Sequence, residues 1–231
     1  MLHLYFVRHA ESLSNVNHHL IGGRSNHTPL TEKGIQQAKK LGERLATTAV
    51  KLDVVAASSA VRAYDTAKIM CERANLDFDQ VLVSDELQEL SQGDWEGKVR
   101  KEIYTPQMLS QINSNNWLHK APNGESQKEV EERMFGWMEK HVFPLNDPDQ
   151  AVHCAIVTHG NAIRCLFRKI MNSTPSMTHR IKLDNTSITK FRYAGDKDWY
   201  LDYVNDHEHL DKSTSPLHVD DLNKKHLQNG R

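Results

Sequence analysis

Cysteine is scarce in this 231-residue sequence, which contains only Cys71, Cys154 and Cys165. The three lie far apart and form no CxxC pair, so their spacing excludes a disulfide framework and the common zinc sites. We interpret them as reduced, buried side chains of an intracellular protein. The sequence also has no basic, apolar leader at its beginning, and no apolar run approaches the ~18 residues of a membrane-spanning helix. We therefore expect a soluble cytoplasmic protein without a membrane partner.

The sequence also has no excess of positive or of negative charge. The 29 lysine and arginine residues nearly balance the 30 aspartate and glutamate residues, which gives a formal net charge of −1. A general nucleic-acid-binding protein carries a basic excess, so nucleic acid is not an expected partner. Apolar residues make up 38% of the chain, which is enough for a core and too much for a disordered protein. The length suits one domain of ordinary to large size, or two small ones.

The sequence does contain an alternation of strand-like and helix-like segments. Apolar runs predict strands at 2–7, 53–59, 81–83, 155–158, 187–193 and 199–204, the last two joined by a turn at 194–197. Helical spacing of apolar residues predicts helices at Ile35, Ala38, Leu41, Leu45 and Ala49 behind the N-cap Thr31, and over 63–74, 125–143 and 163–170. Residues 88–124 are less regular. This alternation predicts an α/β fold, a three-layer α/β/α sandwich with a largely parallel sheet.

Polar residues stand where three of these strands end. Arg8 and His9 end the first strand, Arg62 follows the second, and His159 with Gly160 ends the fourth and begins a helix. Ligands of such sheets bind beyond the carboxyl ends of the strands. Two arginines, two imidazoles and a helix N-terminus at one sheet edge predict a phosphate pocket, because arginine matches phosphate oxygens bidentately. The third strand leads to Glu86 and Glu89, either of which could supply a carboxyl group for acid–base chemistry.

Seven ordered blocks of the sequence carry recognisable motifs. They are residues 7–15 (VRHAESxxN), 29–38 (PLTxxGxxQA), 58–67 (SSxxRAxxTA), 87–97 (LxExxxGxWEG), 124–126 (GES), 157–160 (VTHG) and 184–187 (DNTS). Together they resemble the histidine phosphatase superfamily, also called the phosphoglycerate mutase-like family, and in particular its phosphatase branch. The resemblance spans about residues 2–204. It predicts one catalytic domain over residues 1–205 and leaves 206–231 as a polar C-terminal tail.

The resemblance implies a mechanism. His9 would be a neutral nucleophile that forms a phosphohistidine, with its second ring nitrogen donating to a backbone carbonyl. Arg8, Arg62 and His159 would hold the phosphoryl oxygens, and Glu89 would act as general acid and then general base. No metal and no cofactor are required, because the arginines supply the positive charge. The partner is a small phosphate ester, and the family also suggests a homodimer.

Further residues follow from the same resemblance. Asn15, Gly160, Ser12, Gly22 and Gly23 would contact the phosphate or the substrate.

One residue departs from the family pattern: Ala10 stands where the family usually has glycine after the nucleophilic histidine. If that position needs a positive φ, the methyl group would strain the backbone by about 1–2 kcal/mol and could shift His9.

Three functions remain open from the sequence. The first is hydrolysis of small phosphomonoesters, the second a mutase that depends on 2,3-bisphosphoglycerate, and the third a non-catalytic phospho-ligand-binding protein. The segment around Glu89 resembles the phosphatase branch, and the chain lacks the longer insertion of the mutases, so the phosphatase is favoured. The third hypothesis conflicts with the complete set of charged residues. The natural substrate is not readable, because the loops at 16–28 and 98–123 set specificity.

Overall fold

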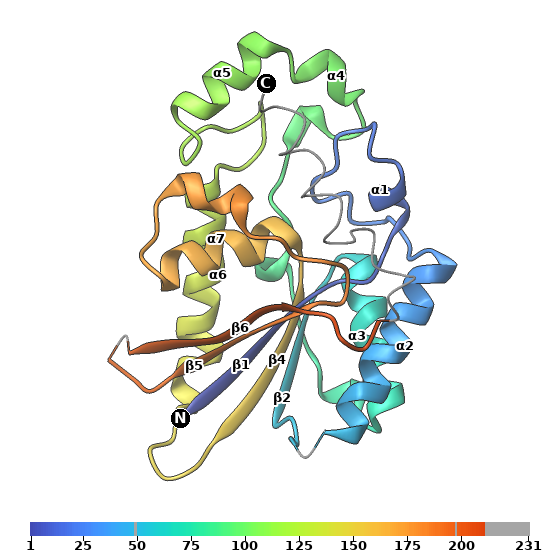
Figure 1. Ribbon diagram of the computed structural model, residues 1–231, viewed down its shortest axis with the longest axis vertical. Coiled ribbons are helices and arrows are strands. Elements are labelled where there is room, and N and C mark those ends of the chain that lie inside the picture. Colours follow the sequence, from blue (N-terminus) through green and yellow to red (C-terminus); the bar gives the residue numbers. More distant parts are fainter. Residues whose placement is uncertain (49, 197, 211–231) are drawn as a thin grey trace, which may run out of the picture.

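The computed structural model describes residues 1–48, 50–196 and 198–210. Its centre is a six-stranded sheet with the strand order β3-β2-β4-β1-β5-β6 (Figure 1). The first four of these strands in the sheet order are mutually parallel, and β5 and β6 run antiparallel to their neighbours. The strands are β1 (Leu2–Arg8), β2 (Val54–Ser58), β3 (Leu82–Ser84), β4 (Val152–Thr158), β5 (Ile188–Tyr193) and β6 (Trp199–Asp206).

Helices cover both faces of the sheet. The pair α2 (Glu32–Thr47) and α3 (Val61–Ala74) lies on one face, and the pair α6 (Gln127–His141) and α7 (Gly160–Ile170) lies on the other (Figure 1). Three shorter helices lie beyond the sheet edge at which the parallel strands end: α1 (Leu13–Val16), α4 (Arg100–Ile103) and α5 (Pro106–Ser114). The 3-10 turns are η1 (Phe78–Gln80), η2 (Asp85–Leu87), η3 (Gly93–Trp95), η4 (Phe143–Leu145) and η5 (Pro175–Arg180).

The sequence of β1 explains the three layers. Leu2, Leu4 and Phe6 belong to the apolar cluster shared with α6 and α7, whereas Tyr5 and Val7 belong to the cluster shared with α2 and α3. Successive strand residues point to opposite faces, so a strand with an unbroken apolar run, as in residues 4–7, must be covered on both sides. The predicted α/β/α sandwich with a largely parallel sheet is therefore confirmed.

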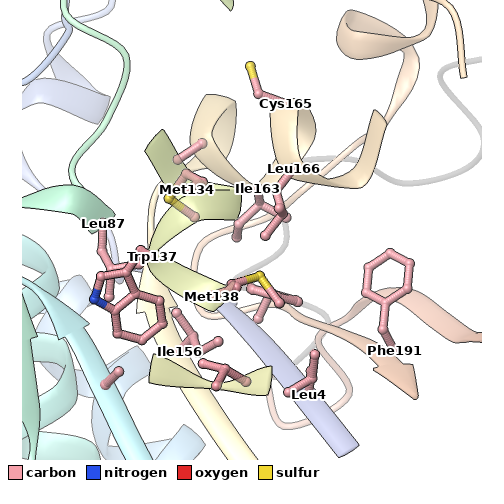
Figure 2. Packing of buried hydrophobic residues seen from close by; sticks show 14 of the residues in the cluster. Leu4, Leu87, Met134, Trp137, Met138, Ile156, Ile163, Cys165, Leu166 and Phe191 are labelled. Carbon is pink, nitrogen blue, oxygen red and sulfur yellow. The ribbon is translucent and has the colours of Figure 1, made fainter. Parts of the chain in front are cut away.

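Trp137 is the largest fully enclosed side chain and anchors α6 to the sheet. It is 2% exposed and packs in the cluster that contains Leu4, Met134 and Leu166 (Figure 2). We expect Trp137→Ala to lower the free energy of unfolding by about 3–5 kcal/mol, because the cavity left behind adds to the lost apolar burial. Urea denaturation measures the change. The matched control Tyr200→Ala removes an aromatic ring that is 44% exposed, and a loss as large as that of Trp137→Ala would contradict the expectation.

The elements predicted from periodicity are present with small shifts of their ends. The helix behind Thr31 is α2, with the Thr31 side chain accepting from Gly34 N, and it ends at Thr47. Ala49, predicted in that helix, and Lys197, predicted in the last turn, lie outside the described residues. The helices α4 and α5 within the irregular segment 88–124 were not predicted.

Among the described residues, no helix has the length and the hydropathy needed to cross a membrane.

The described chain continues past the predicted domain boundary at residue 205. Asp206 is the last residue of β6 and forms an ion pair with Arg44, and Leu210 is buried. The boundary itself stays a prediction, and residues 211–231 of the predicted tail lie outside the described residues.

Candidate active site

The parallel strands bring the predicted residues to one edge of the sheet. Arg8 of β1 is in register with Thr158 of β4, so the residues that follow them, His9 and His159, emerge side by side. Their ring centroids lie 5.1 Å apart. Most of the predicted residues line one cavity of about 610 Å³, namely Arg8, His9, Asn15, Gly22, Gly23, Arg62, Glu89 and Gly160. Ser12 and His159 do not line it.

The protonation of His9 follows from its two hydrogen bonds. Nδ1 lies 2.7 Å from Ala10 O, and because a carbonyl can only accept, Nδ1 carries the hydrogen. Nε2 accepts from Arg62 Nε at 3.2 Å, so it presents a lone pair. Burial, together with the positive charges of Arg62 and Arg8, lowers the pKa of His9 well below 6.5. His9 is therefore a neutral imidazole whose Nε2 carries the lone pair and accepts the hydrogen bond from Arg62, and its role as nucleophile stays a prediction.

The two buried histidines make stability depend on pH. Burial also lowers the pKa of His159 well below 6.5, and Arg62 adds to the effect. Between the folded pKa and 6.5, the unfolded chain binds protons that the folded protein does not, so stability falls as the pH falls. Each histidine contributes a slope of about 1.4 kcal/mol per pH unit below 6.5. Urea denaturation at a series of pH values should show a shallower slope for His9→Gln than for the wild type, and equal slopes would contradict the expectation.

Arg62 is fixed by the loop that carries Gly22 and Gly23. Its side chain, at the start of α3, is 2% exposed and donates from Nη1 to Arg24 O at 2.7 Å and to Ser25 O at 3.1 Å. Its Nη2 donates to Gly23 O at 3.1 Å. A Cβ at position 23 would lie 2.3 Å from Glu96 Oε1 and 3.0 Å from Gln92 N, so a larger residue would displace the Glu96 carboxylate from its bonds to Arg24 N and Gln92 N. The loop therefore holds the guanidinium against His9.

Two buried nitrogens at this edge, Arg8 Nε and His159 Nδ1, have no hydrogen-bond partner among the residues that the structure describes. Arg8 donates from Nη1 to Leu183 O at 2.6 Å, but its Nε is unpaired, and so is His159 Nδ1. Ser58 Oγ, which accepts from Ala60 N, lies 2.8 Å from His159 Nε2 and can donate its hydrogen there, which leaves the ring hydrogen on Nδ1. Unpaired buried donors are rare in proteins and call for an acceptor. A bound phosphoryl group would supply one.

Glu89 occupies the N-terminus of α7. Its Oε1 accepts from Leu90 N at 2.8 Å and from Ala162 N at 3.0 Å, and its Oε2 accepts from Asn161 N at 3.0 Å. The sequence predicted an anion at this helix terminus, and the anion there is the carboxylate of Glu89. Glu86, the competing candidate, is exposed and does not line the cavity.

Arg133 and Glu125 bind to each other and to the backbone of the segment that carries Glu89. Arg133 Nη1 donates to Glu86 O and Gln88 O, and its Nε and Nη2 bind the two carboxylate oxygens of Glu125. Glu125 also accepts from Ser91 N at 3.1 Å. These bonds hold the segment on both sides of Glu89. Glu125, the middle residue of the GES motif at 124–126, therefore has a structural role.

Asn15 and Ser12, in the segment after β1, have different roles. Asn15 Oδ1 accepts from Ser12 N, Ser12 Oγ and Asn185 Nδ2, so the group that Asn15 can still offer a ligand is its amide NH₂. Ser12 is fully buried and is the N-cap residue that precedes α1. The structure thus places Ser12 as a residue that orients Asn15, and Ser14 lines the cavity in its place.

Ala10 causes no backbone strain. Among the described residues, seven non-glycine positions have a positive φ, and Ala10 is not one of them. Its side chain is fully buried and its N–H donates to Thr66 Oγ1 at 3.0 Å. Because the φ of Ala10 is not positive, the backbone strain that could have shifted His9 does not arise.

The sequence missed the outer part of the cavity. Arg164 of α7 and apolar residues of the segment that carries α4 and α5, among them Tyr104, Leu109 and Ile112, line it beyond Glu89. One signal for α5 was present: Thr105 precedes Pro106, and its side chain accepts from Met108 N as an N-cap. Arg164 lies one helical turn after Gly160 on the same face of α7, but the sequence gives no sign that its guanidinium reaches the cavity.

Similar proteins are phosphatases and phosphoglycerate mutases. A 2,3-bisphosphoglycerate-dependent phosphoglycerate mutase of Rhizobium etli is 27% identical over 84% of this chain and 91% of its own. The mycobacterial glucosyl-3-phosphoglycerate phosphatase in complex with VO3 has a TM-score of 0.72 at 27% identity, covering 88% of this chain and 98% of the other. The α-ribazole phosphatase of Shigella flexneri has a TM-score of 0.71 at 25% identity, covering 89% and 96%.

A family profile matches most of the chain, over residues 4–207, and it describes branch 1 of the histidine phosphatase superfamily. The match includes every residue that the site brings together. This chain is a member of the histidine phosphatase superfamily.

Proposed function

We propose that this protein hydrolyses small phosphomonoesters through a phosphohistidine on His9, without a metal ion. The observation that carries the proposal is the state of His9, whose Nδ1 hydrogen is held by Ala10 O and whose Nε2 lone pair faces a buried guanidinium. A neutral imidazole whose unprotonated nitrogen carries a lone pair is the form that can attack phosphorus, once the N–H of Arg62 turns from that lone pair to a phosphoryl oxygen.

In the first step, Nε2 of His9 forms a bond to phosphorus while the bond from phosphorus to the ester oxygen breaks. Arg8 and Arg62 offset the negative charge of the phosphoryl oxygens, which is the work that metal ions do in other phosphoryl-transfer sites. Glu89 gives a proton to the departing oxygen. Its Oε2 accepts one amide hydrogen bond and its Oε1 accepts two, so Oε2 keeps the free lone pair that can carry this proton.

In the second step, water takes the place of the alcohol. The carboxylate of Glu89 accepts a proton from the water as its oxygen bonds to phosphorus, and the bond from phosphorus to Nε2 breaks. His9 returns to its neutral form and inorganic phosphate leaves. Glu89 thus acts first as an acid and then as a base. At the end of each turnover its carboxyl group is protonated again, which is the state that the next turnover needs.

An assay with 4-nitrophenyl phosphate in EDTA tests the proposal directly. We expect release of 4-nitrophenol at an undiminished rate after removal of divalent metals, because the arginines supply the positive charge. A wild-type protein that hydrolyses no phosphomonoester would contradict the proposal, and loss of activity that added metal restores would contradict the metal-independent mechanism.

A bisphosphoglycerate-dependent mutase is the second candidate, favoured by the names of relatives such as the Rhizobium etli protein. In a mutase, the phosphohistidine would transfer its phosphoryl group to a sugar acid and not to water. Incubation with 3-phosphoglycerate, with and without 2,3-bisphosphoglycerate, separates the two functions. Rapid formation of 2-phosphoglycerate that depends on the bisphosphate would favour the mutase, and release of inorganic phosphate would favour the phosphatase.

A further inference from the structure

Thr186 has a strained backbone next to the active site. Its φ is +58°, in the left-handed region that a β-branched residue rarely adopts, because its side chain is crowded there. The residue is fully buried, so its contacts within the protein must hold it in this conformation. Strain of this kind persists only where the surroundings fix it, and it is concentrated at functional sites. The contacts of Thr186 therefore show what the strain maintains.

The strained turn holds the backbone of the proposed nucleophile. Thr186 N donates to Arg8 O at 2.9 Å, and Asn185 Nδ2 donates to His9 O at 2.9 Å. The guanidinium of Arg8 has a separate anchor, because its Nη1 donates to Leu183 O at 2.6 Å. The turn thus fixes the main chain from which the imidazole of His9 extends, whereas the anion-binding group of Arg8 is held by another carbonyl.

His209 binds the side chain of Thr186. Thr186 Oγ1 donates its hydrogen to Asn185 O at 2.7 Å, so towards His209 Nε2, which is 2.9 Å away, it can only accept. His209 Nε2 therefore carries the ring hydrogen, and Nδ1 presents its lone pair to Arg44 Nη1 at 3.5 Å. Burial, together with the positive charge of Arg44, lowers the pKa of His209 to about 4, so the ring is neutral at neutral pH.

His209 is itself held against the end of the sheet. Arg44 of α2 binds both carboxylate oxygens of Asp206, the last residue of β6. Leu210, the next residue after His209, is buried, and its N–H donates to His207 O at 2.9 Å. Residues 206–210, which the sequence assigned to a polar tail, therefore pack against the loop that supports the active site.

We propose that His209 is a positioning residue for phosphoryl transfer, which holds Thr186 in its left-handed conformation and thereby aligns Nε2 of His9 with the phosphorus. The proposal rests on the proposed function, since alignment concerns attack by His9. The guanidinium groups of Arg8 and Arg62 are held by other carbonyls. Loss of His209 should therefore impair attack more than it impairs binding of the phosphoryl group.

The variant His209→Leu tests the proposal, with 4-nitrophenyl phosphate as substrate. We expect kcat to fall about 10- to 100-fold, because a small misplacement of the attacking atom has effects of this size, and KM to change by less than a factor of about three. The amide of His209→Gln can still donate to Thr186 Oγ1, so this variant should keep kcat within about threefold of the wild type.

Glu208→Leu is the matched control. It places the same apolar side chain on the neighbouring residue, which is exposed. It should leave both kcat and KM unchanged.

The affinities for orthovanadate and for inorganic phosphate separate alignment from folding. Vanadate bonded to Nε2 of His9 resembles the transition state, whereas phosphate resembles the bound ground state. His209→Leu should weaken vanadate binding by about the factor lost in kcat and phosphate binding by less than about threefold. A variant that is only less stable would bind both ligands as the wild type does once it is folded. Calorimetry measures both affinities without turnover.

The variant Thr186→Gly tests whether His209 acts through Thr186. Glycine adopts a positive φ without strain, so the backbone at this position no longer needs the bond from His209. In this background, His209→Leu should lower kcat by less than a factor of about three, which is a non-additive result. A loss as large as that in the wild-type background would contradict the proposed route.

Other outcomes would also overturn the proposal. They are a wild-type kcat in His209→Leu, equal losses of vanadate and phosphate affinity in that variant, and a wild type that binds vanadate no more tightly than phosphate. Failure of the proposed function is a different result, in which the wild type hydrolyses no ester. The two affinities report on His209 in that case as well, because their measurement needs no hydrolysis.

Discussion

The His9→Gln variant is expected to lose at least about 10⁴-fold in kcat and to form no phosphoenzyme. The amide of glutamine has the length to keep hydrogen bonds to Ala10 O and Arg62, but it has no lone pair on nitrogen that can attack phosphorus. Because His9 is uncharged in the folded protein, the substitution also leaves the charge of the cavity unchanged. Initial rates with 4-nitrophenyl phosphate measure the loss. Rapid denaturation after mixing with a ³²P-labelled ester should trap alkali-stable, acid-labile label on the wild type alone.

His27→Gln is the control for this experiment. His27 is exposed and does not line the cavity, so its replacement should change neither the rate nor the labelling. Retention of label in His9→Gln would mean that another group is the nucleophile, and His159, at 5.1 Å between ring centroids, would be the first to examine. The mechanism proposed above would then be wrong in its central step.

The residues nearest His9 could be predicted because their places depend on short-range patterns and one rule of topology. Each parallel strand is a run of apolar residues that ends in polar ones, and parallel strands of one sheet end at the same edge. Arg8, His9 and His159 follow from that rule alone. Arg62 follows because α3 begins directly after β2 and places its first turn over the same edge.

The outer cavity could not be predicted because it depends on contacts between distant segments. An arginine such as Arg164 on an amphipathic helix indicates a solvent-facing residue when only periodicity is considered. It borders the cavity because Ile181 O, beyond η5, and Asn161 hold its guanidinium there. Residues 98–123 carry few apolar residues at regular spacing, so α4 and α5 give a weak periodic signal. Their position relative to the sheet depends on packing around Trp95 and Ile21.

The N-terminus of α7 shows how a correct physical rule can be assigned to the wrong anion. A helix terminus attracts negative charge, and the sequence offered the substrate phosphate as its source. The side chain of Glu89, 72 residues before Asn161 in the chain, reaches the amides of Asn161 and Ala162. The helix therefore positions the carboxylate that we propose as the acid–base group, and we propose that Arg8 and Arg62 bind the phosphoryl group.

Replacing Glu89 by glutamine is expected to slow the reaction by an amount that depends on the alcohol. Loss of a general acid costs about 10²- to 10⁴-fold when the departing oxygen needs a proton, as in an alkyl phosphate. The first step should be nearly unaffected for 2,4-dinitrophenyl phosphate, whose phenolate departs without a proton. Glutamine keeps the size of the side chain and its carbonyl can still accept from Asn161 N or Ala162 N. The fold should therefore persist.

The second step still needs a base, so Glu89→Gln should accumulate the phosphohistidine. With 2,4-dinitrophenyl phosphate, stopped-flow absorbance should show a burst of one phenolate per active site, followed by a slow steady state. The exposed residue Glu86 provides the control, and Glu86→Gln should show neither the burst nor the dependence on the alcohol. Equal losses on alkyl and dinitrophenyl esters, without a burst, would show that Glu89 only supports the structure of α7. The same pattern in Glu86→Gln would assign the acid–base role to Glu86, against the geometry of the cavity.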